Sequence, residues 1–525
     1  TYAWVALDLG APGLPLSAFS NPVPLGFIED QCTATSLAQD CNRNGIKDSC
    51  DLAQGSSYDC NGNGLPDECD IAAGTSLDLD QDRLPDECQS TVYVDRSATG
   101  LNDGSSWANA FVDLRTVLDS APPYTRVWVR AGRYTTGTAP FTGSPAFVLK
   151  DRVGLYGGFA GGETSIYQRD IAANPTILDA DLLGNDQPGF QGFDENNWSV
   201  VVIGTEVQRD AVLDGFTLRG GNSSGLGGCA KWAVYFAACE GGGIYSMGSP
   251  TVRRCRFLEN FGGHHGGAVY TTAAPLFIEC SFEDNFALQG GGLYADIGAE
   301  PEFLRCRLVG NSALEGGGLY SRGASSDGLS LHGCLLSANQ AAERGGAILA
   351  LDVGLTLGHC TLAGNRSTQL AGGLWASSLA KPRIHNSILW ENQDQGGQGF
   401  AANLTAGSTL ILGHSSVSGW IPGLPGTAVD ALYPLFVDPL GPDGLAWTGD
   451  ENLALASGSP ALDAGSTGEV PLDVYDLDRD GDVFERLPLD LAGKPRFVDL
   501  PSAPNLGLTL PGYGFTDRGA FERQN

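Results

Sequence analysis

The chain has 525 residues, 42% of them hydrophobic and 74 of them glycine, and its formal net charge is −31. This hydrophobic share can fill a sizeable core, so the chain is not of the disordered class. The strong negative charge disfavours nucleic acid and anionic lipid as partners. No run of about 18 apolar residues occurs, so the sequence predicts no membrane insertion.

The cysteines and the first residues indicate export. Six of the 13 cysteines fall between residues 32 and 88, a density typical of an oxidising compartment. The chain starts at Thr1 and has a single Met, from which we infer a removed leader and a secreted, extracellular location at the cell surface. Residues 1–31 form an apolar, proline-containing tail that could be donated to a neighbour as a strand.

Three similar segments begin at Asp40, Asp59 and Asp78, spaced 19 residues apart. Oxygen-bearing side chains recur at positions 1, 3, 5 and 9, and position 7 would offer a carbonyl, which is the ligand order of an EF-hand-type Ca²⁺ loop. Arg83 replaces glycine at position 6 of the third segment and Gln89 replaces aspartate at position 12, so this loop should bind most weakly. The predicted ligands are Asp40, Asn42, Asn44, Ile46, Asp48 and Asp51 in the first loop, Asp59, Asn61, Asn63, Leu65, Asp67 and Asp70 in the second, and Asp78, Asp80, Asp82, Leu84 and Asp86 in the third.

The alternative for these segments is a set of Asx turns without metal, but three copies at one period favour calcium. No amphipathic helix is expected beside the loops. The segments resemble the calcium loops of thrombospondin type 3 and dockerin-like repeats. Six cysteines allow 15 pairings; sequential pairing is our prediction: Cys32–Cys41, Cys50–Cys60 and Cys69–Cys88. Cys229 and Cys239 bracket an insertion and are expected to form another disulfide.

A repeat of 25–28 residues dominates the middle of the chain. Gly-Gly pairs from Gly242 to Gly373 are each followed by an apolar residue and then by a Cys-x-apolar-x-x-Asn element. A sixth copy has Asn386 in the cysteine position. The columns comprise Cys255, Cys280, Cys306, Cys334 and Cys360, and Asn260, Asn285, Asn311, Asn339, Asn365 and Asn392. Short strands of period two at this spacing predict an all-β, right-handed parallel β-helix with an inward ladder of reduced cysteines and a ladder of asparagines.

These repeats resemble the polymorphic outer membrane protein family through Gly345-Gly346-Ala347-Ile348, the Phe257 to Asn260 element and the Phe282 to Asn285 element. The resemblance implies a right-handed β-helix on a bacterial surface, often adhesive. Residues 110–119 suggest a short amphipathic helix that could cap the N-terminal end of the solenoid.

Residues 441–525 resemble a choice-of-anchor region through the motifs that begin at Ser459, Asp490 and Asp517. A fourth calcium pattern lies within this part, at Asp476, Asp478 and Asp480, with a solvated acidic loop as the alternative. The predicted organisation is a tail over 1–31, calcium-binding disulfide repeats over 32–90, a β-helix over 91–440 and a C-terminal module over 441–525.

No complete catalytic constellation is evident in the sequence. A glycoside hydrolase needs paired carboxylates, and the Gly263 to Gly266 segment matches polygalacturonases only in part. The outward column of Arg254, Glu279 and Arg305 suits mutual pairing. The sequence therefore predicts a non-enzymatic structural protein, a calcium-stabilised β-helix that assembles head-to-tail into a homopolymer. The alternatives are a monomeric adhesin for glycan or protein, and a polysaccharide lyase or hydrolase of the pectin-lyase-like fold.

Overall fold

The structure is a computed structural model that describes residues 32–34, 36, 39–42, 45–137, 146–224, 231–232, 236–237, 240–323, 328–406 and 410–524. The chain divides into two compact units, residues 1–77 and 78–525. The third acidic segment therefore groups with the β-helix and not with the first two. Residues 1–31, Asn44 and the pair Cys229–Cys239 lie outside the described residues.

The first unit contains two acidic loops, each followed by a short helix, α1 (Asp48–Gln54) and α2 (Asp67–Ala72). These helices correct the expectation of loops without helices; at six and seven residues they are too short to show a helical period in the sequence. Disulfides join Cys32 to Cys50 and Cys41 to Cys69, so the predicted sequential pairing is wrong. Cys60 and Cys88 are also disulfide-bonded.

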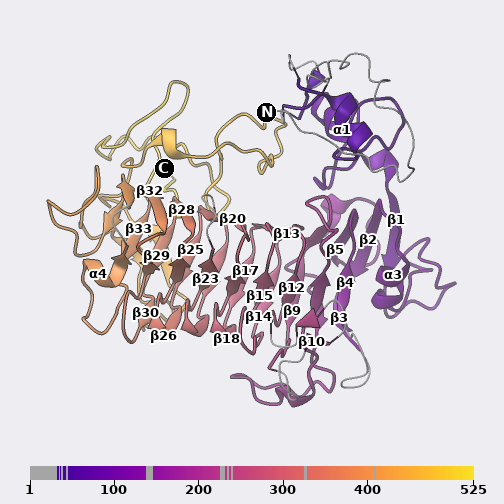
Figure 1. The fold of residues 1–525 in the computed structure, drawn as a ribbon, viewed down its shortest axis with the longest axis horizontal. Helices are drawn as coiled ribbons and strands as arrows, with labels where there is room; N and C mark the ends of the chain where they lie inside the picture. The colour runs from indigo at the N-terminus through magenta and orange to yellow at the C-terminus, as the bar shows by residue number, and fades with distance from the viewer. Residues whose placement is uncertain are drawn as a thin grey trace, which may run out of the picture. The chain divides into compact units, whose positions relative to one another are not determined.

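The second unit is a parallel β-solenoid built from three long sheets, which confirms the predicted fold (Figure 1). The eleven-stranded sheet contains β1 (Ser90–Val94), β2 (Thr125–Arg130), β5 (Val153–Phe159), β8 (Val212–Asp214), β13 (Thr251–Arg253), β16 (Leu276–Ile278), β20 (Glu302–Leu304), β24 (Leu329–His332), β28 (Gly354–Gly358), β32 (Lys381–His385) and β35 (Ile411–Gly413). The ten-stranded sheet contains β3 (Gly132–Thr135), β6 (Thr176–Asp179), β9 (Phe216–Arg219), β14 (Arg256–Leu258), β17 (Ser281–Glu283), β21 (Arg307–Val309), β25 (Leu335–Ser337), β29 (Thr361–Ala363), β33 (Ile388–Trp390) and β36 (Ser416–Val417).

The nine-stranded sheet contains β4 (Phe147–Leu149), β7 (Val201–Ile203), β12 (Ile244–Ser246), β15 (Val269–Thr271), β19 (Leu293–Ala295), β23 (Leu319–Arg322), β27 (Ile348–Leu351), β31 (Leu374–Ala376) and β34 (Leu404–Thr405). A shorter sheet of β18 (Phe286–Gln289), β22 (Ser312–Glu315), β26 (Gln340–Arg344) and β30 (Arg366–Ser367) lies in the corner before it. Two antiparallel pairs complete the strands, β10 (Lys231–Trp232) with β11 (Phe236–Ala237), and β37 (Phe436–Asp438) with β38 (Asn452–Leu455).

Two positions in each repeat fix the tight corner that leads into the nine-stranded sheet; both are glycine in five repeats, and Ala371 takes the first position in the sixth. Gly290 has φ +68°, in the left-handed region where a side chain is strained. A Cβ on Gly291 would lie 2.5 Å from the carbonyl oxygen of Gly317 in the next coil. The Gly-Gly signature therefore reflects both backbone conformation and the close approach of stacked coils.

The predicted columns are present. The five repeat cysteines are buried and free, and the thiols point into the core at the corner between the eleven- and ten-stranded sheets. In the sixth copy, Ser387 and not Asn386 holds the cysteine position, because its Oγ accepts from the backbone N–H of Cys360 and Thr361 pairs with Ile388. The N-terminal end of the core is closed by α3 (Leu114–Ser120), which buries Leu114, Val117 and Leu118 as expected for a cap.

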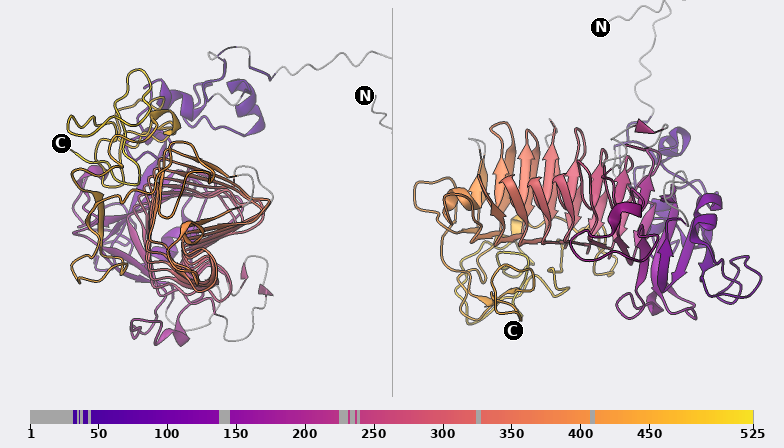
Figure 2. Two further views of the ribbon diagram at one scale, coloured as in Figure 1. Left: turned by 90° about the vertical axis from the view of Figure 1, so that its left-hand side faces the viewer. Right: turned by 90° about the horizontal axis from the view of Figure 1, so that it is seen from below.

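The C-terminal segment covers two outer faces of the solenoid, and Figure 2 shows it along one side. Phe436, Leu453 and Leu462 pack on outward residues of the ten-stranded sheet such as Trp390. Residues around Val470 and Leu487 pack on outward residues of the eleven-stranded sheet. This part of the chain is therefore a cover on the solenoid.

This cover makes buried histidines sensitive to acid. Burial lowers the pKa of His385 to about 4, against an ordinary value near 6.5 in the unfolded chain. Between these values the unfolded state binds a proton that the native state does not, so stability falls as the pH drops below 6.5. His385 alone should cost about 2 kcal/mol at pH 5.

Replacing His385 by Gln should therefore reduce by about 2 kcal/mol the loss of unfolding free energy between pH 7 and pH 5, measured by urea denaturation. The matched control is His264→Gln, since His264 is exposed. Equal pH slopes for the wild type and His385→Gln would contradict the assignment.

Candidate functional site

The two acidic loops of the first unit close in the manner of calcium loops. In the second loop, Asp59 at position 1 accepts hydrogen bonds from the backbone N–H groups of Gly62, Asn63 and Gly64 at 2.8–3.1 Å. Asp70 at position 12 accepts from Asn61 (3.0 Å) and Asn63 (2.7 Å), so positions 3, 5 and 12 converge.

The first loop follows the same plan within its described residues. Asp40 Oδ2 accepts from Gly45 N–H at 2.9 Å, and the buried Asp51 lies beside Asn42. The acid at position 9 in each loop, Asp48 or Asp67, instead accepts the backbone N–H of the cysteine at position 2, at 2.9 Å.

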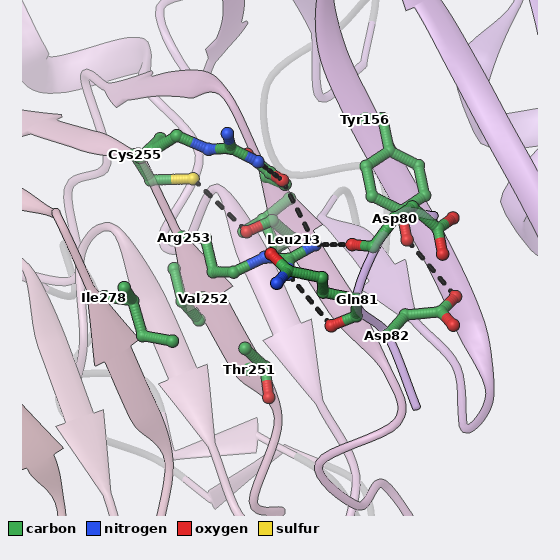
Figure 3. A network of polar contacts seen from close by, with 12 residues as sticks. Asp80, Gln81, Asp82, Tyr156, Leu213, Thr251, Val252, Arg253, Cys255 and Ile278 are labelled. Atoms are coloured by element: carbon green, nitrogen blue, oxygen red, sulfur yellow. Dashed lines mark hydrogen bonds and ion pairs between the residues drawn. The ribbon is translucent and has the colours of Figure 1, made fainter. Parts of the chain in front are cut away.

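Hydrogen bonds hold the third acidic segment against the outer face of the solenoid (Figure 3). Arg253 donates to the carbonyl oxygens of Asp80 (2.7 Å) and Gln81 (2.9 Å), and Tyr156 O–H donates to Asp82 at 3.2 Å. Asp78, Asp80 and Asp82 place carboxylate oxygens within 4.8 Å of one another. The position-9 acid, Asp86 in the 3-10 helix η2 (Asp86–Cys88), instead pairs with Arg126 at 2.6 Å.

This carboxylate cluster is only partly compensated, since the ion pair of Asp80 with Arg126 is 3.9 Å long. Asp80 is only 4% exposed, and neither of its carboxylate oxygens has a hydrogen-bond partner. Burial, and then the charge of Asp80, raise the pKa of Asp78 to about 7 and that of Asp82 well above its usual range. Three neighbouring carboxylates with one long ion pair and no hydrogen bond to Asp80 are costly to bury, so the cluster has the chemistry of a site for a hard cation.

The C-terminal loop brings together one of the three predicted ligands, Asp478, with two acids that were not predicted. The residues brought together are Asp473, Asp478 and Glu485, whereas Asp480 is exposed and caps its own turn through the N–H of Asp482. Asp473 is fully buried with Oδ1 unpartnered, and Glu485 Oε1 is likewise buried without a partner. Sequence reasoning missed Asp473 and Glu485 because they lie outside the Asp-x-Asp-x-Asp-Gly pattern. The fold of the loop brings their carboxylates next to that of Asp478.

A cavity of about 470 Å³ lies beside the third segment, and residues lining it include Asp80, Arg169, Arg254 and Arg479. Its cations are already engaged. Arg169 and Arg254 both pair with the fully buried Asp214, and these guanidinium groups hold the pKa of that carboxyl below its usual range against the effect of burial. Arg479 lies over the ring of Tyr167 at 5.2 Å. The arginines that line the cavity are therefore held by a buried carboxylate or against an aromatic ring.

The outer face of the nine-stranded sheet carries a column of aromatic side chains. Register pairs Tyr245, Tyr270, Tyr294 and Tyr320 on successive strands, with ring centroids 5.0–5.7 Å apart and interplanar angles of 9–18°. In the part of the chain that the structure describes, the members of this cluster all come from this sheet and the residues adjoining it. We call this column and its flanking charged residues the aromatic face.

Three pairs of charged side chains flank the aromatic face. Their members are Glu240 with His265, Asp296 with Arg322, and Glu315 with Arg344. His265 Nδ1 lies 2.7 Å from Glu240 Oε2, and its ring stacks on that of Tyr294 with a centroid separation of 4.2 Å. The side chains of Arg322 and Arg344 are 40% and 34% exposed.

This arrangement orients a histidine as a base. A carboxylate at Nδ1 holds the imidazole in the tautomer that leaves Nε2 free to accept a proton. The two partly exposed guanidinium groups can bind a substrate carboxylate. Sequence reasoning saw His265 only as part of an incomplete hydrolase motif. The tyrosines after four of the six Gly-Gly pairs were the signal that could have identified the face.

No family model and no curated protein matches the chain, so the expected likenesses to polymorphic outer membrane proteins, dockerin-like repeats and a choice-of-anchor region have no support. Solved structures with a similar fold include pectate lyase Pel9A (14% identity, TM-score 0.42, 83% of this chain and 98% of that one) and a rhamnogalacturonan lyase (11%, 0.32, 70% and 97%). Another is the A-module of the mannuronan C-5 epimerase AlgE4 of Azotobacter vinelandii (14%, 0.29, 65% and 89%).

The identities are all below 25% and the TM-scores below 0.5, so the likeness is one of fold, and the fold of this chain rests on its own strand pairings. By name two of these proteins are lyases and one is an epimerase, so the comparisons give no support to the prediction of a non-enzymatic protein. The prediction rested on a search for catalytic residues by sequence motif, and that search does not detect residues brought together from different coils.

Proposed function

We propose that the protein is an enzyme that cleaves an acidic polysaccharide by β-elimination at the aromatic face. The observation that carries this proposal is the Glu240–His265 pair, which lies on a stacked aromatic floor two strands from the partly exposed Arg322. The four tyrosines are 0–9% exposed and stack on one another, so they support His265 from beneath. The groups that a sugar chain would contact are the side chains of His265 (26% exposed) and Arg322 (40% exposed), and guanidinium groups suit carboxylates.

In the proposed reaction, Arg322 binds the carboxylate of a uronic acid residue and so acidifies the adjacent C5–H bond. His265 Nε2 removes that proton, the C5–H electron pair forms a C4=C5 double bond, and the C4–O4 bond breaks. The departing oxygen takes a proton from solvent, and His265 returns its proton to solvent.

Hydrolysis fits the aromatic face less well. A glycosidase of the usual type needs two carboxyl groups free to act as acid and as base or nucleophile. Among the described residues of the face, Glu240, Asp296 and Glu315 are each engaged with a cation. Elimination needs only one base and a partner for the substrate carboxylate. Arg322 binds Asp296 through Nε and Nη2, so its Nη1 is the group proposed to bind the substrate carboxylate.

The test is a panel of acidic polysaccharides incubated with the full chain, with absorbance near 235 nm reporting the unsaturated ends that elimination creates. We expect new absorbance with at least one polyuronate and none with neutral glucans. New reducing ends without this absorbance would show hydrolysis, and binding without cleavage would show an adhesin; either result would overturn the proposal.

The six disulfide-bonded cysteines fit a secreted protein. The longest described helices have seven residues and cannot cross a bilayer. Cell-surface attachment and head-to-tail self-association remain predictions.

Calcium is the proposed ion for the acidic loops, because all their ligands are oxygen atoms. In the C-terminal loop the structure and the sequence pattern favour different ligands, which gives a direct test. Glu485→Gln should lower Ca²⁺ affinity and remove part of the Ca²⁺-dependent rise in Tm, whereas Asp480→Asn should leave both close to wild type.

Calcium titration calorimetry and thermal denaturation at fixed Ca²⁺ would measure these effects on the full chain. Both variants remove one formal charge, so a difference between them reports position and not charge. A larger loss from Asp480→Asn would restore the ligand set expected from the sequence.

A further inference from the structure

A second kind of acidic cluster lies in a loop that no calcium motif marks. Asp181, Asp186 and Glu195 lie between β6 and β7, and their carboxylate oxygens are within 4.8 Å of one another. Asp181 is 2% exposed, while Asp186 Oδ1 and Glu195 Oε1 are buried without hydrogen-bond partners. These acids do not have the spacing of an EF-hand-type loop. Position 6 counted from Asp181, where such a loop has glycine, is Asp186.

Asn196 supplies an independent observation. Its side chain is 1% exposed, and its Nδ2 donates to Asp186 Oδ2 (2.8 Å) and to the carbonyl oxygen of Gly220 (2.7 Å). These two bonds use both amide hydrogens and hold the carboxamide against the cluster. Its Oδ1 is nevertheless buried and unpartnered, which is costly for a polar atom unless a ligand satisfies it.

The local charges favour a divalent ion. Asp179 lies next to the cluster and pairs with Arg133 and Arg219 through its Oδ2 at 2.6 and 2.8 Å. Asp179 and the cluster together carry four negative charges, and the two guanidinium groups carry two positive charges. The remaining charge of −2 equals that compensated by one divalent cation, and the oxygen-only donor set is that of a hard ion.

We infer that Asp181, Asp186, Glu195 and Asn196 bind a divalent cation, Ca²⁺ by the chemistry of the donors, and that this ion fixes the loop over residues 180–197. The loop leads directly into β7, the second strand of the nine-stranded sheet. Within it, Phe190 packs on Phe261 and Phe286 of the following coils, at 5.5 and 6.1 Å between ring centroids. The ion would thus order a corner that borders the aromatic face.

Equilibrium dialysis of the full chain with Ca²⁺ tests this site. The variants Asp186→Asn and Glu195→Gln should each bind one Ca²⁺ fewer than the wild type, or bind one at least tenfold more weakly. The matched control is Asp194→Asn, because Asp194 is exposed in the same 3-10 helix, η4 (Phe193–Glu195). Unchanged stoichiometry and affinity in both cluster variants, or an equal loss in Asp194→Asn, would overturn the inference.

A measurement on the wild type keeps the inference testable if a variant fails to fold. Chymotrypsin should cut near Leu183 or Phe190 faster in EDTA than in Ca²⁺, with the fragments identified by mass spectrometry. Equal cleavage rates at these residues in both buffers would count against a cation in this loop.

Discussion

Replacing His265 by Gln should lower the rate of polyuronate cleavage by at least about 100-fold, because a positioned general base contributes roughly 10²–10⁴ to the rate. Glutamine keeps much of the side-chain volume above Tyr294 but cannot accept and release a proton near neutral pH. The initial rate of absorbance increase near 235 nm, on the substrate identified in the polysaccharide panel, measures the effect.

The control for this prediction is the neighbouring histidine. His264→Gln removes an exposed imidazole one residue away and should leave the rate within about twofold of wild type. Arg322→Gln should instead raise KM for the acidic substrate, since it removes the proposed partner of the carboxylate. Wild-type activity in His265→Gln, with the variant folded as judged by circular dichroism, would exclude His265 as the base.

The solenoid could be predicted because its repeat appears in the sequence as a nearly constant spacing of equivalent residues. Stacked coils place equivalent residues above one another, so the Gly, Cys and Asn columns appear at a near-constant interval. The prediction for the sixth copy was wrong by one residue. Asn386 has a left-handed φ of 50° and forms the corner, and the next residue, Ser387, takes the cysteine position. A period locates a coil, but the corner decides which residue points inward.

The sequence predicted which segment carries the disulfides but not which cysteines pair. Cys41 holds position 2 of the first loop and bonds Cys69 at position 11 of the second loop. The predicted pairs Cys50–Cys60 and Cys69–Cys88 also join consecutive loops, but the observed bond connects the start of the first loop to the end of the second. Spacing alone does not separate these alternatives, because both join cysteines in neighbouring segments.

The aromatic face was missed for a different reason. Tyr245, Tyr294 and Tyr320 lie two residues after a Gly-Gly pair and Tyr270 lies three residues after one, so the sequence shows a nearly regular column. Which neighbours come within bonding distance of them depends on corners of varying length, which bring His265 and Glu240 together from adjacent coils. Side chains that meet across coils leave no local motif.

Substituting Asn311 by Ala should cost about 3–6 kcal/mol of unfolding free energy. In the ladder, Asn311 Oδ1 accepts from the backbone N–H of Asn285 (3.1 Å) and from its Nδ2 (2.9 Å), and Asn311 Nδ2 donates to the carbonyl oxygen of Phe282 (2.8 Å). All of these ladder groups are buried, with Asn285 and Asn311 at 0% exposure. Alanine would leave three polar groups without partners, at about 1–3 kcal/mol each before relaxation.

Urea denaturation followed by tryptophan fluorescence measures this cost, and Ser312→Ala is the matched control. Ser312 follows Asn311 directly, is half-buried and lies outside the ladder, so its substitution should change stability by no more than about 0.5 kcal/mol. Because coils contact only their neighbours, the loss at one ladder position is not diluted by the length of the array. A cost below about 1 kcal/mol for Asn311→Ala would mean that the coils are held by their apolar core and strand pairing alone, and that the asparagine column only marks the corner.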